Sequence, residues 1–294
     1  MDTQNLLQFE GYRVHLTAVA YRMLGSLTEA DDVLQEAWLR LARTDPAGID
    51  NLGGWLTTAV SRICLDLLRS RAIRREDALD TRLPDPIIRR DDPTDPEQQA
   101  VLTDSVGMAL LVVLDSLNPT ERIAFVLHDM FAVPFETIAP IIGKTSTATR
   151  TLTSRARRRV QGSTPRADSD RPRQRRVVDA FLAAARGGDF DALLAILDPE
   201  VVLRGDAGNG LLLLRGDAAV AGNLAVFRRS ANASVSHPIL LNGAPGLLNT
   251  VDGQPISVIA FTIVDGLIVA IDLISDRARL TRIVPATHGD SITR

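Results

Sequence analysis

Apolar residues recur every three to four positions along the first 75 residues of the chain, which is the spacing of amphipathic helices. The first such series covers 6–23 and ends at a Gly–Ser pair. A second helix is expected over 28–43, with Thr28 as its N-cap and Asp31 as the capping-box partner. A third series, 55–75, begins at a tryptophan. This part of the chain therefore predicts a small helical domain.

A proline-rich break separates this domain from a second helical one. Residues 77–100 carry four prolines and many acidic side chains, which predicts a linker. Helical spacing then resumes, and "PFETIAPIIGKTSTATRTLTSRARRRV" (134–160) joins two helical series through Gly143. That arrangement is typical of a helix-turn-helix. Pro140 lies within the first of the two helices and is expected to shorten or kink it.

The second helix of this motif carries residue types that read DNA. In a helix-turn-helix it enters the major groove, where early side chains meet base edges and later arginines meet phosphates. The alternative is a plain helical hairpin with a solvated basic end, but the arginines crowded over 155–159 favour a polyanion-binding surface. Leu152 and Ala156 are expected to face inward. The side chains expected to be exposed are Thr147, Thr149, Arg150, Thr153 and Arg157.

The last part of the chain changes from helical to strand-like spacing. After one helical series, short apolar runs alternate with Gly, Asp and Asn at turn positions, which predicts an α+β domain. The expected fold class is multidomain, with two all-α domains followed by one α+β domain. The expected bounds are 1–76 and 101–161 for the helical domains, 77–100 and 162–174 for linkers, 175–285 for the α+β domain and 286–294 for a tail.

Composition narrows the class of protein. A net charge of −3 argues against a uniformly basic coat, although the 33 basic residues, all arginine except Lys144, are unevenly distributed. Cys64 is the single cysteine, which fits a reducing compartment. We find no signal peptide and no apolar run near the ~18 residues of a membrane span, so a cytoplasmic protein without a membrane partner is expected. The four histidines are scattered, so neither a metal site nor a cofactor is expected.

One aromatic side chain lies beside a cationic track. Trp55 stands at the start of the third helical series, and Arg62, Arg69, Arg71 and Arg74 follow it. Taken singly, a tryptophan is usually part of a core and a charge run is usually a solvated face. Together they supply stacking for bases and positive charge for a backbone, which is what a single-stranded nucleic acid requires.

Three long motifs carry a resemblance to a known family. "YRMLGSLTEADDVLQEAWLRL" (21–41) and "GGWLTTAVSRICLDLLRSR" (53–71) resemble region 2 of the extracytoplasmic-function sigma factors of bacterial RNA polymerase. "LNPTERIAFVLHDMFAVPFETIAPIIGKTSTATRTLTSRARRRV" (117–160) resembles their region 4. The order of the motifs and the linker between them agree with this family.

The rest of the chain resembles the SnoaL-like extension that one group of these sigma factors carries. Residues 175–285 look like that cone-shaped α+β domain. "RLPDPI" (82–87) resembles the group's linker motif, with Arg82 where tryptophan is usual. "DAGNG" (206–210) partly resembles its glycine-rich motif, and "SDRARL" (275–280) stands where Asn-Pro-Asp-Lys-Leu is usual.

The resemblance implies a function and a set of contact residues. It implies an alternative sigma factor, not an enzyme, that binds core RNA polymerase and promoter DNA and initiates transcription. The SnoaL-like domain would modulate this activity, and its conical fold offers an interior for a small-molecule ligand. No catalytic or metal-binding residue is implied. By motif match, core polymerase would be bound by Asp31, Asp32, Gln35 and Glu36, the −10 element by Asp50, Asn51, Trp55, Ser61, Arg62, Arg69, Arg71 and Arg74, and the −35 element by Ser146, Thr147, Thr149, Arg150, Thr153, Arg155 and Arg157.

Two other functions compete with this interpretation. A helix-turn-helix regulator with a ligand-sensing C-terminal domain would leave the acidic helix and the Trp55–arginine track without a role. An isomerase-like enzyme with an accessory DNA-binding part would need a carboxylate base, for which Asp206, Asp217 and Asp272 are candidates by composition alone.

Overall fold

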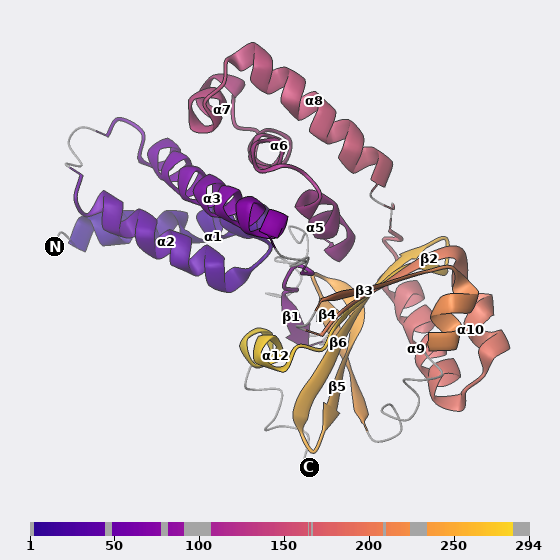
Figure 1. The fold of residues 1–294 in the computed structure, drawn as a ribbon. Coiled ribbons are helices and arrows are strands. Elements are labelled where there is room, and N and C mark those ends of the chain that lie inside the picture. Colours follow the sequence, from indigo (N-terminus) through magenta and orange to yellow (C-terminus); the bar gives the residue numbers. More distant parts are fainter. Residues whose placement is uncertain are drawn as a thin grey trace. The chain divides into compact units, whose positions relative to one another are not determined.

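The chain folds into two compact units, as the computed structural model in Figure 1 shows. One unit is 1–79 with 110–164, and the other is 80–109 with 165–294. The first is helical and the second is built on one sheet, which confirms the expected all-α and α+β parts. The structure describes residues 3–44, 49–77, 82–90, 107–163, 165, 167–207, 210–223 and 234–284, with side chains from residue 8 onward except at 74–77.

The N-terminal part of the helical unit consists of three helices, α1 (Thr3–Leu24), α2 (Leu27–Leu41) and α3 (Leu52–Asp77). Gly25, at φ 73°, ends α1, and the chain passes directly into α2 with Ser26 as the N-cap residue. The expectation that Thr28 caps α2 is therefore wrong, because the abrupt turn at Gly25 already places Thr28 inside the helix. Asn51 caps α3, since its side-chain oxygen accepts from the Gly54 N–H at 2.9 Å.

The second part of the helical unit contains the helix-turn-helix. Asn118 and Glu121 form a capping box at the start of α6. The turn after α7 is made by Gly143 at φ 69°, and α7 ends two residues beyond Pro140, as expected of a shortened helix. The elements are α5 (Met108–Asp115), α6 (Pro119–Phe125), the π-helix η2 (Val126–Met130), α7 (Phe135–Ile142) and α8 (Ser146–Ser163).

The second unit is a seven-stranded sheet in the order β1-β4-β5-β6-β7-β2-β3. Among the strands of the described residues, only β2 and β7 pair in parallel. Helices α9 and α10 pack on the sheet (Figure 1), and Phe181 meets Phe261 edge to face at 5.0 Å in the core beneath them. The elements are β1 (Ile88–Arg90), α9 (Arg171–Gly187), α10 (Phe190–Ile196), β2 (Leu197–Asp206), β3 (Leu211–Arg215), β4 (Val235–Leu241), β5 (Ala244–Val251), β6 (Gln254–Val264), β7 (Leu267–Ile274) and α12 (Arg277–Ile283).

Strand β1 comes from the segment expected to be a linker. It pairs antiparallel with β4, with Ile88 opposite Leu241. Just before it, the Ile87 N–H donates to the Asn242 side chain at 2.7 Å, and the Asn242 N–H donates to the Ile87 carbonyl at 3.0 Å. Residues 82–90 thus belong structurally to the sheet unit, although they precede it by more than seventy residues in sequence.

The second expected linker, 162–174, is also largely structured. Helix α8 continues to Ser163, and α9 begins at Arg171 rather than at 175. Between them, the Asp168 N–H donates to the Ile263 carbonyl at 2.8 Å. The Asp168 carboxylate accepts from the N–H groups of Asp265 and Gly266 at 2.9 and 3.1 Å. The chain is therefore fixed to the β6–β7 turn before α9 starts.

Candidate functional site

The acidic face of α2 presents the four residues expected to bind a protein partner. Asp31, Asp32 and Gln35 are exposed, and Glu36 is partly exposed with an ion pair to Arg40 at 2.9 Å. The opposite face is buried and includes Leu34, Ala37 and Leu41. The helix therefore divides cleanly into a packed side and an acidic side.

A shallow groove runs beside this acidic face, between α1 and α2. Its volume is about 430 Å³. The rings of Phe9 and Trp38 lie 5.3 Å apart and give it an apolar floor. Arg13 binds Glu10 at 2.7 Å on the rim, and this hydrogen bond lowers the pKa of the Glu10 carboxyl. The lining residues are Phe9, Glu10, Arg13, Asp31, Leu34, Gln35 and Trp38, of which sequence reasoning had selected only Asp31 and Gln35.

The start of α3 brings together the residues expected to capture a base. Asp50 is exposed and Trp55 is half-buried, so part of the indole faces solvent. Gly53 lies close under Tyr12, because a Cβ there would be 2.8 Å from Cε1 of the ring and the ring would have to shift. Tyr12 lies within the first helical series, 6–23, yet it is 38% exposed and lies beside this helix start. The side chain of Asn51 is engaged in capping the helix.

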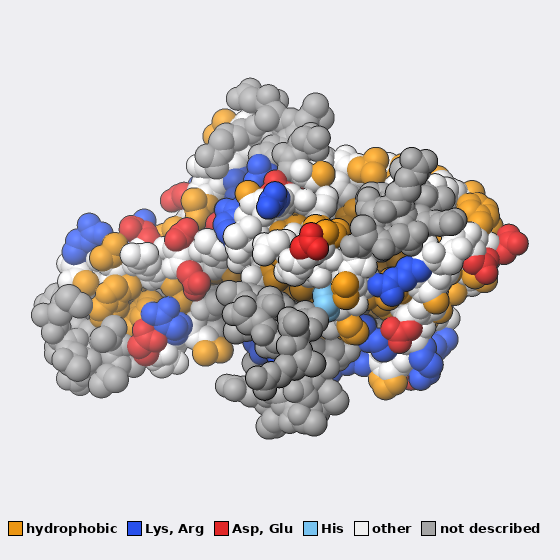
Figure 2. All heavy atoms as spheres, turned by 90° about the horizontal axis from the view of Figure 1, so that it is seen from below, with side chains coloured by type: hydrophobic (Ala, Val, Ile, Leu, Met, Phe, Trp, Pro, Cys, Tyr) orange, Lys and Arg blue, Asp and Glu red, His pale blue; other side chains and the backbone are white. Residues whose placement is uncertain are grey.

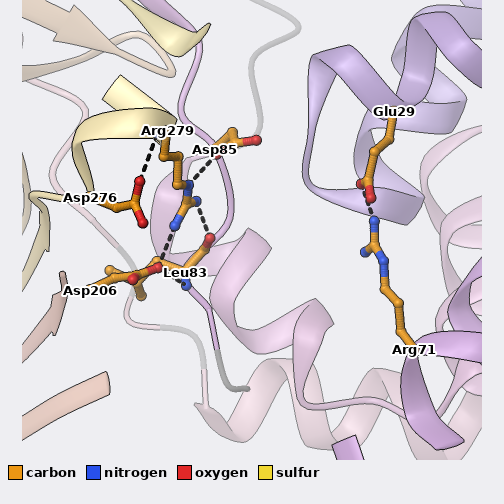
Figure 3. Close-up of polar contacts among 7 residues, drawn as sticks. All are labelled: Glu29, Arg71, Leu83, Asp85, Asp206, Asp276 and Arg279. Carbon is orange, nitrogen blue, oxygen red and sulfur yellow. Dashed lines mark hydrogen bonds and ion pairs between the residues drawn. The ribbon is translucent and has the colours of Figure 1, made fainter. Parts of the chain in front are cut away.

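Among the described residues, the expected cationic track along α3 is only partly exposed. Arg62 and Arg69 are exposed. Arg71 is half-buried, donates to the Leu24 carbonyl at 3.1 Å and pairs with Glu29 (Figure 3), so it ties α3 to the start of α2. The side chain of Arg74 lies outside the described residues.

Ser61 does not face the surface that the prediction gave it. It is fully buried, and its hydroxyl donates to the Thr57 carbonyl one turn earlier at 2.7 Å. A side chain in this position cannot reach a base without unfolding the helix around it. The prediction that Ser61 contacts the −10 element therefore has no support from its position.

Helix α8 buries a different face from the one that the sequence predicted. Thr149 and Thr153 are buried, and their hydroxyls donate to the carbonyls of Thr145 and Thr149 at 2.9 and 3.0 Å. The expectation that both are exposed is wrong, because this bonding to the preceding turn lets threonine enter an apolar interface. Leu152, expected inside, is only half-buried, whereas Ala156 is buried. The remaining expected −35 residues are exposed, except for half-buried Ser146: Thr147, Arg150, Arg155 and Arg157.

Three of the exposed arginines of α8 already have carboxylate partners, and one of them, Arg159, pairs with Glu121 at 3.4 Å. Arg157 makes two hydrogen bonds to Asp129 at 2.8 and 2.5 Å, and these raise the pKa of the guanidinium. Arg150 pairs with Glu136 at 3.3 Å. The face of the molecule in Figure 2 shows basic side chains interspersed with acidic and apolar ones, in keeping with the net charge of −3. The carboxylates of Asp129 and Glu136 would compete with any anion for Arg157 and Arg150.

A buried arginine joins three sequence motifs in the sheet unit (Figure 3). Arg279 of α12 is 5% exposed and donates to Asp206 of β2, to Asp85 and to the Leu83 carbonyl. The Leu83 N–H completes the cluster by donating to Asp206 at 3.3 Å. The segments 82–87, 206–210 and 275–280, which the sequence resemblance had singled out, therefore meet at one point.

The candidate catalytic acids are engaged in structural contacts. Asp272 is buried on β7 and binds Arg204 at 2.5 and 3.2 Å, and burial raises the pKa of its carboxyl although Arg204 acts against this. Asp206 binds Arg279, and Asp217 accepts from the adjacent Ala218 N–H at 2.6 Å. Because strand residues alternate between faces, Asp206 and Asp272 lie opposite the face packed under α9 and α10.

The described residues contain neither a cluster of metal-binding side chains nor a membrane-spanning helix. No group of three or more His, Cys, Asp or Glu side chains among them is arranged to hold a metal ion. Among the same residues, no helix is long and apolar enough to cross a membrane.

Two parts of the helical unit match known protein families. Residues 8–73 match the family Sigma-70 region 2, and residues 107–160 match Sigma-70, region 4. The chain is 44% identical over 202 residues to the ECF RNA polymerase sigma factor SigJ of Mycobacterium tuberculosis, covering 68% of this chain and 64% of SigJ. It is 35% identical over 266 residues to the probable ECF RNA polymerase sigma factor SigI of the same species, covering 90% and 91%. The crystal structure of M. tuberculosis SigJ matches with a TM-score of 0.74 at 34% identity, covering 94% of this chain and 98% of that one.

Proposed function

Because the chain belongs to the extracytoplasmic-function RNA polymerase sigma factors, we propose that it binds core RNA polymerase and directs it to promoters with specific −35 and −10 elements. The observation that carries this proposal is that acidic and basic surfaces lie on different helices of the helical unit. An acidic, grooved surface lies on α1 and α2, and exposed arginines lie on α3 and α8. We assign the protein to the cytoplasm, beside polymerase and promoter, and assign it no catalytic role.

The acidic face of α2 is the proposed polymerase-docking surface. Asp31, Asp32, Gln35 and Glu36 supply charge and hydrogen bonding, which steer association with a basic partner. The adjoining groove, with Phe9 and Trp38 at its floor, adds an apolar contact that can be desolvated on binding. Acidic side chains also repel DNA, so this surface is suited to a protein partner.

The proposed −10 surface is the exposed side of α3. Trp55 supplies a stacking surface, and Arg62 and Arg69 supply charge for the backbone of an opened strand. Asn51 and Arg71 are engaged in contacts within the fold, since one caps α3 and the other joins α3 to α2. We therefore leave Ser61 out of this surface and give Asn51 and Arg71 a supporting role.

The proposed −35 surface is the exposed side of α8. Thr147 and Arg150 lie in its first two turns, where side chains of a recognition helix reach base edges. Arg155 and Arg157 lie farther along and suit phosphates. Thr149 and Thr153 stabilise the packing of α8 and are not assigned a contact with DNA.

Substitution of Arg150 tests this −35 assignment. We expect Arg150→Ala to lower the preference for the correct −35 base by about 1–3 kcal/mol, because a base-edge contact is lost. The measurement is transcription from templates with single −35 substitutions. Arg158→Ala, at an exposed position on the same helix, is the control and should weaken all templates about equally. A uniform loss with Arg150→Ala would place Arg150 on phosphate instead.

The sheet unit is the proposed modulator of activity. It holds residues 82–90, which lie between the two promoter-binding regions in the chain, through β1 and Arg279. If the sheet unit releases or tightens its hold on 82–90, the segment that connects the two promoter-binding regions changes, and no contact with DNA is required. This coupling supports a regulatory role for the SnoaL-like domain.

Truncation after residue 164 tests the modulator. We expect promoter-dependent transcription to change several-fold while the −35 base preference stays the same, because α8 lies wholly within the retained part. The measurement is in vitro transcription with full-length and truncated protein at matched concentrations. Equal activity on all templates would exclude modulation by this domain.

One experiment separates the sigma-factor function from its main alternative. Core polymerase with this protein as the sole added factor should initiate at discrete sites on genomic fragments, and mapped start sites should share two elements. A helix-turn-helix regulator would produce no transcripts under these conditions and would act only when another sigma factor is present.

A further inference from the structure

Phe135, at the start of α7, lies between a histidine and an arginine. The apolar pattern places it on the inner face of its helix, yet it is only partly buried. Its ring stacks on His128 with 3.8 Å between centroids and an interplanar angle of 27°. The guanidinium carbon of Arg150, on α8, lies 5.5 Å from the Phe135 centroid. The ring of Phe135 therefore links the π-helix η2 to α8.

The neighbouring residue provides a second restraint on the same arginine. Glu136, in the first turn of α7, pairs with Arg150 at 3.3 Å. Both partners of that pair are well exposed, with side-chain exposures of 63% for Arg150 and 66% for Glu136. An aromatic face and a carboxylate thus contact one guanidinium, and both come from adjacent residues of the other helix of the motif.

The His128 ring, on which Phe135 stacks, is itself held by the backbone. His128 lies in the π-helix η2, and its Nδ1 is 3.1 Å from the Val133 carbonyl. The Val133 N–H in turn donates to the Leu127 carbonyl at 2.9 Å. These bonds hold the connection between η2 and α7, so the histidine ring has a defined orientation against Phe135.

We propose that Phe135 and Glu136 are positioning residues that orient Arg150 for reading a base edge in the −35 element. A long arginine side chain on an exposed helix has many rotamers and reaches phosphates from most of them. Bidentate recognition of a base needs one orientation of the planar guanidinium. The restraint therefore acts on discrimination between sequences more than on affinity. This inference rests on the proposed −35 role of Arg150.

The test is a double-mutant cycle between Phe135 and Arg150 in the full-length protein with core polymerase. The readout is the ratio of transcription from the matched −35 template to that from single-base variants. Phe135→Leu keeps apolar bulk but removes the ring, and should lower this ratio about two- to fivefold. Phe135→Tyr keeps the ring and should retain the ratio. In an Arg150→Ala background, Phe135→Leu should have no further effect.

Each outcome of the cycle bears on the proposal. If Arg150→Ala lowers the ratio but Phe135→Leu does not, or if the two effects add, the positioning role is overturned while the −35 assignment stands. If Arg150→Ala leaves the ratio unchanged, both fall. If circular dichroism shows that the Phe135→Leu protein does not fold, Glu136→Gln, at an exposed position, replaces it in the cycle. This variant should lower the transcription ratio about twofold. No loss with Glu136→Gln would then overturn the proposal.

Discussion

Replacing Arg279 by leucine is expected to lower the free energy of unfolding of the sheet unit by about 3–5 kcal/mol, because it takes the guanidinium away from the buried Asp206 carboxylate. Asp206 is 2% exposed and loses its guanidinium partner, and the Leu83 carbonyl loses a donor. Asp85, at the surface of the cluster, loses its ion pair as well. The segment 82–90 should then detach from α12 more readily than in the unaltered protein.

Two measurements check this expectation. The thermal transition of the sheet unit should move to lower temperature, and limited proteolysis should cut within 82–90 at lower protease concentration. Arg282→Leu is the matched control, since Arg282 is exposed on the same helix and should leave both readouts unchanged. An Arg279→Leu protein that resists protease as well as the control would mean that β1 pairing alone holds the segment.

Reversing the charge at Asp32 and Glu36 together is expected to weaken binding to core polymerase roughly 10- to 100-fold, since like charges would face a basic partner surface. Both residues lie on the solvent side of α2, so the packed side should be unaffected. Glu36→Arg also removes the pair with Arg40 and places like charges four residues apart, which costs only about 0.2–0.5 kcal/mol in a helix.

The binding measurement needs a control with the same change in net charge. Asp179→Arg with Glu200→Arg reverses two exposed acids of the sheet unit and should bind core polymerase as the unaltered protein does. Pull-down and titration of labelled protein against core polymerase give the two affinities. Equal affinities for the two double variants, with both folded, would remove α2 from the docking surface.

The family and the three-part fold class are confirmed, and the helical parts were the most predictable. The acidic side of α2 follows from the positions of Leu34, Ala37 and Leu41, because a 3.6-residue period fixes the opposite face. The same period assigned the wrong buried face to α8, where Thr149 and Thr153 are more buried than Leu152. A threonine hydroxyl that bonds to its own helix behaves as an apolar group, and hydropathy does not record this.

The long-range contacts could not be derived from local spacing. Strand β1 lies among prolines and acids, which locally predict a linker, and it becomes a strand only because the edge of β4 accepts it. The motif resemblance marked Asp206 and Arg279 as notable, but their contact joins residues 73 positions apart. Such pairings depend on the whole fold, so the sequence pattern identified the motif segments but did not predict the contacts between them.

Strand β1 makes the C-terminal domain discontinuous in the chain, which has a practical consequence for fragments of this protein. A fragment that starts at residue 165 retains β4 but lacks the strand that pairs with its outer edge. An unpaired edge strand is a template for association with other chains, so this fragment should self-associate. Supplying 82–90 as a separate peptide, or fusing it ahead of residue 165 through a flexible loop, restores the missing strand. The C-terminal domain is thus built from two separate segments of the chain. The peptide concentration at which the fragment becomes monomeric would measure how tightly β1 binds to β4.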